Sequence, residues 1–449
     1  MTVAALGPRL VVAGTHSGVG KTTIATGIMA ALRAKGLRVA SAKVGPDFID
    51  PGYHAAATGR APRNLDAWIC GEGAVVPLAG RAAAGADLLV VEGVMGLFDG
   101  AAGGGGASTA HVAHLLEAPV VLVVDAAAMS GSVAALIHGF ATFDPAVPVA
   151  GVVLNNVGSD GHEDMLREAA AVTGVPVLGA MRRDAALGWR GRHLGLVPVA
   201  EQADLVRRSV EDLAAAVGRH CDLDALVAVA GAAPPRSTEP PARAHPSGRA
   251  RVAVASGPAF SFSYQDNLEA LEAAGAELIP FDPAVDPALP EAVTAVVAGG
   301  GFPEVFAQAL ADNRPLLGEL RRSVASGLVV WAECGGLLWL ARSFDGHVLC
   351  GSIPADGRMT GRLSLGYRTG VARVDTPLAR RGVELRGHEF HYSALDPPGD
   401  GLDLRGRLGG GPGGFASATM LASYLHLHLG GDPTPAERFV AAATPRDGG

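Results

Sequence analysis

Short apolar runs alternate with longer amphipathic segments along both halves of the chain. Nine runs have the length and the β-branched composition of buried strands, whereas Thr22–Lys35 has the period of a helix. Buried strands separated by helices favour mostly parallel sheets covered on both faces, with ligands at the carboxyl ends of the strands. The pattern therefore predicts an α/β fold in each half. The runs are Arg9–Ala13, Arg38–Ala42, Leu88–Glu92, Pro119–Asp125 and Val149–Asn155, then Arg251–Ser256, Glu277–Phe281, Ala295–Ala298 and Leu328–Ala332.

The segment 232–249 lacks this apolar period. It is rich in proline, serine, alanine and arginine, which is a composition typical of linkers. We therefore expect one domain over residues 1–231, a linker over 232–249 and a second domain over 250–449.

Composition excludes several classes of protein. The net charge is −8, and the chain has only three lysines, none of them in a basic run, so we expect no nucleic-acid partner. No apolar run reaches the roughly 20 residues of a membrane span. The four cysteines match neither a zinc site nor a dense disulfide scaffold, and a reducing cytoplasm is the simplest compartment.

The first predicted strand runs into a glycine-rich loop, GTHSGVGKTT from Gly14, and a helix follows. Such a loop wraps phosphates with backbone N–H groups, while its lysine reaches the β- and γ-phosphates and its threonine hydroxyl binds Mg²⁺. The usual first glycine falls at Thr15, a variant that resembles the dethiobiotin synthetase and partition-ATPase branch of P-loop proteins. The residues expected to bind ATP are Ser17, Gly18, Val19, Gly20, Lys21, Thr22 and Thr23.

Acidic residues that could complete a metal site follow two of the strands. Asp47 and Asp50 lie in a loop after the second strand, and Glu92 ends the third. Because Mg²⁺ prefers oxygen ligands and keeps waters, one or two carboxylates with Thr22 suffice. We expect Thr22, Asp47 and Glu92 at the metal. An exposed loop acid is an equally good interpretation of Asp50.

The second half contains a strand, a sharp turn and a helix around Cys334. A cysteine held at a helix N-terminus is favoured as a thiolate, and the neighbouring Gly335 and Gly336 indicate tight geometry. The alternative is a buried structural cysteine. Backbone N–H groups of Gly301 and Gly335 are candidates for an oxyanion hole.

The base for this cysteine must come from elsewhere in the chain. Ser423–Leu429 alternates in polarity, so His426 and His428 would face one side of a strand. One histidine can abstract the thiol proton, and the other could orient it. Core or surface histidines without a catalytic role are the alternative.

Seven segments, in order, resemble the cobyrinic/hydrogenobyrinic acid a,c-diamide synthase family. The resemblance covers the chain from Val11 to about Gly430, apart from the linker. The segments are GTHSGVGKTTI from Gly14, KVGPDFIDPGYH from Lys43, VVEGVMGLFDG from Val90, RHLGL from Arg192, AECGGL from Ala332, GHEFHYS from Gly387 and SYLHLHL from Ser423.

The resemblance implies a dethiobiotin synthetase-like P-loop domain that phosphorylates the a- and c-acetate carboxylates of a corrinoid, hydrogenobyrinic or cobyrinic acid. It also implies a class I-like glutamine amidotransferase domain that supplies ammonia. Cys334 matches the nucleophile, and His426 matches the histidine that activates it. Many class I enzymes have an acid two residues after this histidine, but that position is His428 here, which implies a Cys–His dyad.

Residues of the synthetase half also match family positions. Asp47, Asp50 and Glu92 match metal or phosphate positions. Phe48, Ile49 and Asp99 match positions near the reacting carboxylate, where we also place Asp50. Because the ring carries several carboxylates, we expect cations around it. The candidate is Arg192, in a cluster with Arg182, Arg183 and Arg190, although ordinary surface arginines are the alternative.

The expected partners are ATP, L-glutamine and a corrinoid carboxylate, with Mg²⁺ as cofactor. A homodimer is one of the assemblies that we expect. Two other functions stay open. Cobyric acid synthase is a related amidotransferase, but it usually lacks the PDFIDP and EFHYS forms. A partition-type ATPase switch with an inert C-terminal module would need neither Cys334 nor His426.

Overall fold

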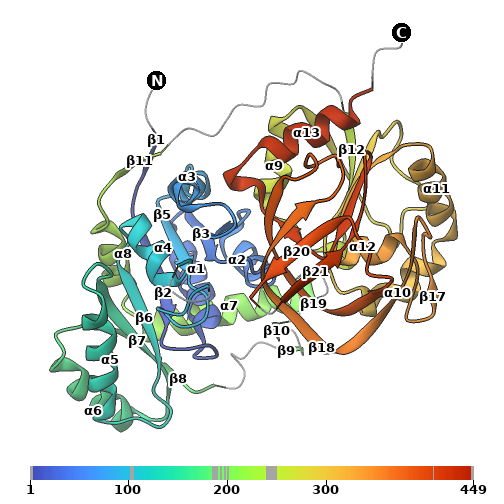
Figure 1. Cartoon of the computed structure of the whole chain (residues 1–449). Helices are drawn as coiled ribbons and strands as arrows, with labels where there is room; N and C mark the ends of the chain where they lie inside the picture. Colours follow the sequence, from blue (N-terminus) through green and yellow to red (C-terminus); the bar gives the residue numbers. More distant parts are fainter. Residues whose placement is uncertain are drawn as a thin grey trace. The chain divides into compact units, whose positions relative to one another are not determined.

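The computed structural model describes residues 4–101, 106–184, 191–192, 195–196, 199, 202–238, 250–407 and 409–445. The chain divides into two compact units, Met1–Pro241 and Ala242–Gly449 (Figure 1). Each unit is described by itself below.

The first unit contains a seven-stranded sheet in the order β4-β3-β5-β2-β6-β7-β8, with every pair of neighbours parallel. All five predicted strands are present, and β4 and β8 extend the two edges. The central strands are buried because their Val, Leu and Ala side chains meet helices on both faces. The strands are β2 (Arg9–Gly14), β3 (Val39–Val44), β4 (Arg63–Leu65), β5 (Leu88–Glu92), β6 (Val120–Asp125), β7 (Val149–Val157) and β8 (Val177–Arg182).

Helices cover this sheet on both sides (Figure 1). Apolar residues of α3, α4, α5 and α6 join one core cluster with the sheet, while α1 packs against α7. The predicted helix Thr22–Lys35 is α1, displaced by one residue. The helices are α1 (Lys21–Ala34), α2 (Asp50–Thr58), α3 (Glu72–Ala83), α4 (Thr109–Leu116), α5 (Ser132–Phe143), α6 (Asp160–Ala171), α7 (Ala203–His220) and α8 (Leu223–Gly231).

The first residues of the expected linker belong to the first unit. Strand β11 (Arg236–Thr238) pairs with β1 (Ala4–Leu6). The buried guanidinium of Arg9 donates to the carbonyl of Pro234 at 2.8 Å. Residues 234–238 of the expected linker are thus held to the first unit by these backbone contacts. Residues 239–249 lie outside the described part.

The second unit contains a six-stranded sheet in the order β13-β12-β14-β15-β23-β22. Its neighbours are parallel except for the β22–β23 hairpin. The four predicted strands of this half are its first four members. The strands are β12 (Ala250–Ala255), β13 (Ala276–Phe281), β14 (Ala295–Ala298), β15 (Val329–Glu333), β22 (Phe415–Ser417) and β23 (Met420–Ser423).

A second, seven-stranded sheet in this unit is mostly antiparallel, contrary to the expectation of mostly parallel sheets. Its longest strand alternates buried and exposed residues at its start, as half-exposed antiparallel strands do. That polar alternation gives no continuous apolar run. The strands are β16 (Ala341–Phe344), β17 (His347–Val348), β18 (Ile353–Ala372), β19 (Glu384–Asp396), β20 (Leu402–Gly406), β21 (Gly409–Gly413) and β24 (His426–Leu427).

The prediction of one strand over Ser423–Leu429 is wrong. The chain leaves the six-stranded sheet at Ser423 and enters the second sheet as the two-residue strand β24, which pairs with β19. The helices of this unit are α9 (Gln265–Ala273), α10 (Pro303–Asp312), α11 (Arg314–Ala325), α12 (Gly335–Leu340) and α13 (Thr434–Ala443), with 3-10 turns η3 (Pro258–Phe260) and η4 (Leu429–Gly431). Among the described residues, none of the helices is both long and apolar enough to cross a membrane.

Candidate active sites

The glycine-rich loop connects the end of β2 to the start of α1 at the carboxyl edge of the parallel sheet. Gly20 has φ of 95°, and a Cβ at this position would collide with the Asn155 amide. That amide, at the end of β7, donates to the Val19 carbonyl at 2.8 Å. The expected ATP-binding residues 17–23 therefore form one continuous turn, supported by a neighbouring strand.

Lys21 follows this loop as the first residue of α1 and has little exposure to solvent. Its Nζ donates to the carbonyl of His16 at 3.1 Å. Burial lowers its pKa to about 8, and the charge of Lys43 contributes, whereas Glu92 and Asp50 oppose the shift. The Lys21 ammonium group therefore lies against the backbone of the glycine-rich loop.

Three oxygen-bearing side chains meet beside Lys21. The Thr22 hydroxyl donates to Glu92 Oε1 at 2.7 Å and lies 3.3 Å from Asp50 Oδ2. One hydroxyl and two carboxylates are hard donors that fit a divalent cation such as Mg²⁺. The described residues hold no cluster of three or more His, Cys, Asp or Glu side chains able to bind a metal alone. Phosphate and water would have to supply the remaining ligands.

Asp47 and Asp50 occupy different places from those expected. Asp47 Oδ1 accepts from the backbone N–H groups of Ile49 (2.6 Å) and Asp50 (3.1 Å), so this carboxylate shapes the start of α2. Asp50 is the residue that reaches Thr22. Burial and the charge of Asp47 raise the pKa of Asp50 to about 7, against the opposing effect of Lys43.

Two residues of this site had no predicted role. Lys43 Nζ lies 2.6 Å from Asp50 Oδ2 and 2.8 Å from Glu92 Oε1, and the lysine is only 3% exposed. His54 Nε2 lies 2.6 Å from Glu92 Oε2. Burial would raise the pKa of Glu92, but Lys43 and His54 hold it well below its usual range. Both residues belong to the KVGPDFIDPGYH segment, which is the signal that could have identified them.

The expected substrate residues lie around the same edge. Phe48 is half-buried, Ile49 is buried and Asp99 is exposed, with Asp99 Oδ2 accepting from Gly96 N at 2.8 Å. The backbone of Arg192 is in the short strand β9 (Gly191–Arg192), which pairs with β10 (Gly195–Leu196), but its side chain lies outside the described part.

Other arginines of the predicted cluster have structural partners or are not described. Arg182 lies 2.9 Å from Glu163 of α6, and the backbone of Arg183 donates to Val157. Arg190 lies outside the described residues. The cluster is therefore not available as a whole for an anionic substrate.

Cys334 follows β15 directly and precedes α12, as predicted. It has φ of 48° and ψ of −98°, a strained conformation for a residue other than glycine and the mark of a nucleophile elbow. Its backbone N–H donates to the Ser423 carbonyl at 2.9 Å. Gly336, two residues after Cys334, must lack a side chain because a Cβ there would collide with the carbonyl of Ala298. The backbone therefore fixes the direction of the thiol.

The two glycines proposed for the oxyanion hole are neighbours in space. A Cβ built on Gly335 would lie 3.2 Å from the backbone nitrogen of Gly301. A Cβ on Gly300 would lie 2.6 Å from His426 Cε1, so the histidine reaches the same place. The loop after β14 and the turn after β15 thus converge with His426.

His426 is buried between Cys334 and Glu333 of the elbow and a second histidine. Burial lowers its pKa, but hydrogen bonding to Cys334 and Glu333 more than compensates, so that its pKa is raised to about 10. Its ring stacks on His388 of β19 with centroids 5.0 Å apart. Burial and the neighbouring histidines lower the pKa of His388 well below its usual value. Of these two histidines, His426 is therefore the one whose surroundings stabilise the protonated imidazolium.

His428 has different neighbours from His426. Its Nε2 lies 3.7 Å from Asp266 Oδ2, and its ring lies 4.4 Å from that of Tyr264. Its Nδ1 accepts from the backbone of Gly430. The two histidines are close in sequence, yet each faces an acid of its own.

Comparison with known proteins identifies a domain of known kind in each half of the chain. Residues 10–195 match the CobQ/CobB/MinD/ParA nucleotide binding domain, and residues 251–434 match the CobB/CobQ-like glutamine amidotransferase domain. The hydrogenobyrinate a,c-diamide synthase of Streptomyces coelicolor is 50% identical over 96% of this chain and 97% of the relative. The chain belongs to the a,c-diamide synthase family.

Further members of the a,c-diamide synthase family are similar over comparable lengths. The hydrogenobyrinate enzyme of Thermobifida fusca is 48% identical over 98% of each chain. The cobyrinate a,c-diamide synthase of a Synechococcus species is 40% identical over 96% of this chain and 98% of the relative. The protein is thus a ligase that forms amides with nitrogen from glutamine, and an inert C-terminal module is excluded.

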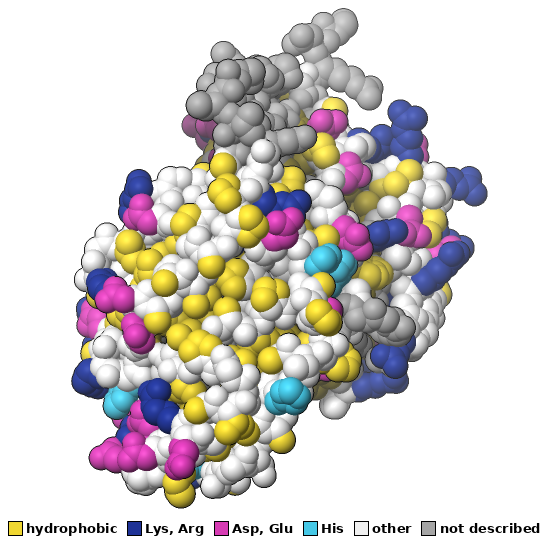
Figure 2. Space-filling view, turned by 90° about the vertical axis from the view of Figure 1, so that its left-hand side faces the viewer, with side chains coloured by type: hydrophobic (Ala, Val, Ile, Leu, Met, Phe, Trp, Pro, Cys, Tyr) yellow, Lys and Arg dark blue, Asp and Glu magenta, His cyan; other side chains and the backbone are white. Residues whose placement is uncertain are grey.

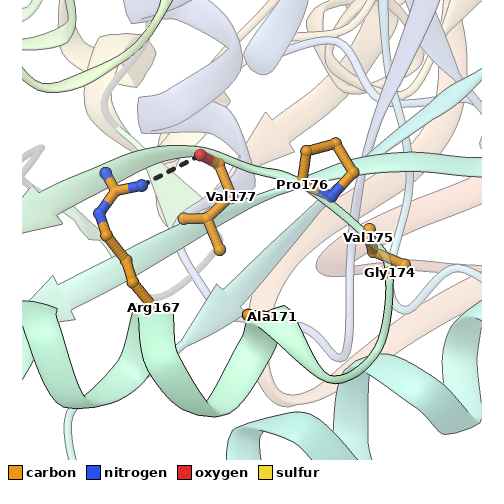
Figure 3. A pocket seen from close by; sticks show the side chains of 6 residues that line it. All are labelled: Arg167, Ala171, Gly174, Val175, Pro176 and Val177. Atoms are coloured by element: carbon orange, nitrogen blue, oxygen red, sulfur yellow. Dashed lines mark hydrogen bonds between the residues drawn. The ribbon is translucent and has the colours of Figure 1, made fainter.

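Two further features of the described part of this synthase carry no sign of a site. A hollow of about 300 Å³ lies between α6 and the amino end of β8, opposite the edge that holds the phosphate loop (Figure 3). Arg167 on its wall donates to the Val177 carbonyl at 3.1 Å, so its guanidinium has a structural partner. The face in Figure 2 mixes acidic and basic side chains among apolar ones and shows no continuous basic patch.

Proposed function

We propose that this synthase uses ATP, Mg²⁺ and L-glutamine to convert the a- and c-acetate carboxylates of hydrogenobyrinic acid into amides. The choice of ring rests on the sequence identity of this chain to two groups of relatives. Relatives named for hydrogenobyrinate are 48–50% identical, whereas those named for cobyrinate are 39–41% identical. This difference favours the metal-free ring.

The first unit would activate the carboxylate. A carboxylate is a poor electrophile because its negative charge is delocalised, and phosphorylation turns one oxygen into a leaving group. Lys21 would exchange the His16 carbonyl for a phosphate oxygen, and backbone N–H groups of the loop would bind the β-phosphate. Bound Mg²⁺ would neutralise charge on the transferring phosphoryl group. Thr22, Asp50 and Glu92 would hold it, and Asp47 would act by fixing the loop before α2.

The second unit would release the ammonia. Cys334 would attack the amide carbon of glutamine as a thiolate, with N–H groups of Gly301 and Gly335 donating to the oxyanion. The His426 imidazolium would give its proton to the amide nitrogen as the C–N bond breaks, so that ammonia leaves and a thioester remains, which water hydrolyses to glutamate. Because α12 has only six residues, we attribute the thiolate mainly to His426 rather than to the helix dipole.

A hollow of about 510 Å³ in the first unit is our candidate for part of the corrinoid site. Phe98, next to Asp99, lines it together with Phe143, His111 and His114. The ring centroids of Phe98 and Phe143 are 4.6 Å apart, and Phe143 is largely exposed. Aromatic surface of this kind suits the apolar face of a macrocycle. Phe48, Ile49 and the side chain of Arg192 remain proposed substrate contacts.

We also propose a cytoplasmic enzyme, a homodimer, and domains joined after residue 238. The four cysteines are free thiols, which supports a reducing compartment. Light scattering of the purified enzyme tests the dimer.

The function is tested by offering purified enzyme each ring separately with ATP, Mg²⁺ and glutamine. We expect hydrogenobyrinic acid to gain two amide groups, seen as two successive mass losses of about one unit each by mass spectrometry. Faster turnover of the cobalt-containing ring would contradict the choice of substrate. Amidation at other side chains would indicate cobyric acid synthase instead.

A further inference from the structure

Glu333 directly precedes the nucleophile Cys334, and its carboxylate turns toward His426. Its Oε2 lies 3.4 Å from His426 Nδ1, and both side chains are almost fully buried. The other oxygen, Oε1, accepts from Trp331 Nε1 at 2.9 Å and from the backbone of Leu427 at 2.9 Å. One carboxylate thus connects β15 to the strand that carries the histidine.

The two bonds to Oε1 determine where the carboxylate lies. Trp331 is two residues before Glu333 on the same strand, and Leu427 follows His426 on β24. An N–H donor from each strand therefore holds Oε1, which leaves Oε2 directed at the imidazole. A carboxylate held in this way can fix the tautomer of a histidine and stabilise its protonated form.

We propose that Glu333 is the positioning acid of His426, so that the glutamine site works as a Cys–His–Glu triad rather than the dyad expected from sequence. The acid comes from the residue before the nucleophile, because the position two residues after the histidine is His428. This inference rests on the proposed role of Cys334. In the reaction the thiol proton passes to His426 Nε2 and then to ammonia, while Nδ1 keeps its proton toward Glu333.

A second acid in this region offers an internal comparison. Asp266 is also buried and lies beside His428, at 3.7 Å, on the side of Tyr264. If an acid–histidine pair other than Glu333–His426 served the nucleophile, it would be this one. Asp266→Asn is therefore the matched control for Glu333→Gln, since each change removes one buried negative charge and keeps the size of the side chain.

Glu333→Gln separates a positioning role from a merely structural one. The amide oxygen can still accept from Trp331 and Leu427, so the fold keeps both bonds, while the charge facing His426 disappears. We expect kcat with glutamine to fall about 10²-fold, with KM for glutamine changed less than about threefold. Ammonia-driven amidation should be unchanged, and Asp266→Asn should retain glutamine-driven turnover.

The pH dependence of Cys334 alkylation by iodoacetamide is a second readout. The groups that face His426 are Cys334 and Glu333 from the elbow and His388 and His391 from β19; His388 also faces His428. In the wild type, imidazolium should accompany the thiolate from pH 7 to 9, so the alkylation rate should change less than about threefold. In Glu333→Gln the rate should be low at pH 7 and rise about tenfold by pH 9.

Wild-type glutamine turnover and a flat alkylation profile in Glu333→Gln would overturn the inference. So would a loss confined to Asp266→Asn, which would assign the role to the other pair. Equal loss with glutamine and with ammonia would also overturn it, because a positioning acid of the glutamine site does not serve phosphorylation. Failure of the proposed function is distinguishable, since it would appear as a Cys334→Ser variant that still uses glutamine.

Discussion

The two sites of this synthase differ in how their buried ionisable side chains are paired. In the phosphate site, Lys43 lies 2.6 Å from Asp50 and 2.8 Å from Glu92, and His54 lies 2.6 Å from the other oxygen of Glu92, so the buried lysine is paired with two carboxylates. In the glutamine site, four histidines are buried, and the environment favours protonation of His426 while opposing it for His388. The charged side chains of the first site suit the binding of anionic phosphates and a cation. In the second site, the surroundings determine which histidine carries a proton.

The sites also differ in how the chain assembles them. The phosphate site comes from loops at one edge of a single parallel sheet, which is where such sheets bind ligands. The glutamine site needs both sheets of its unit, because β15 contributes Glu333 and Cys334 while β19 and β24 contribute His388 and His426. Changes in the first site should therefore affect both nitrogen donors, and changes in the second should affect glutamine alone.

The largest effect is expected from Lys21→Ala. Without the ammonium group, charge on the transferring phosphoryl is poorly stabilised, so amidation should fall about 10³-fold or more with either nitrogen donor. Glutaminase activity, measured as glutamate released, should persist. Normal product formation would remove Lys21 from the mechanism and with it the contrast between the sites. Lys35→Ala, an exposed lysine at the other end of α1, is the matched control.

His426→Ala should lower glutamine-driven amidation about 10²–10⁴-fold, because the thiol loses its base and ammonia its proton donor. His428→Ala should cost far less, since His428 faces Asp266 rather than the nucleophile. Steady-state rates with glutamine and with ammonium chloride at alkaline pH compare the two variants. An equal loss in both variants would mean that the histidines act together, as the alternation of Ser423–Leu429 first suggested.

The smallest effect is expected from cutting the chain between residues 241 and 249. A cut here spares β11 and the bond from Arg9 to Pro234, which hold residues 234–238 to the first unit. The fragment 1–241 should remain folded and amidate with ammonia at a rate within about threefold of the intact chain, because each unit has its own core. Circular dichroism and the ammonia-driven rate check this. Aggregation of both fragments would indicate one shared core.

Local signals predicted much of the fold and of the phosphate site. Strands Leu88–Glu92 and Ala295–Ala298 have the predicted bounds, because fully buried parallel strands are continuous apolar runs. The loop up to Thr22 could be interpreted because its glycines, lysine and threonine follow one another in a single segment between a strand and a helix. Asp47 and Asp50 could not be told apart, since the Asp47 side chain turns to nearby N–H groups instead of the site.

The glutamine site could be predicted only in part from such local signals. Cys334 was identifiable from a strand, a turn and two glycines within one segment. The alternation of Ser423–Leu429 suggested one strand, but the chain changes sheets inside it, which separates the surroundings of His426 and His428. Glu333 gave no signal, because its partner lies 93 residues away and the pairing of β15 with β23, which places Glu333 opposite Ser423, brings the two together.

The central claim is that the two units perform separate reactions linked only by ammonia. Cys334→Ser tests it most directly, measured as the pair of initial rates with glutamine and with ammonium at alkaline pH. We predict loss of glutamine-driven amidation and retention of the ammonia-driven rate. If both rates fall together, Cys334 is structural; if neither falls, the nucleophile is elsewhere and the account of the second unit is wrong.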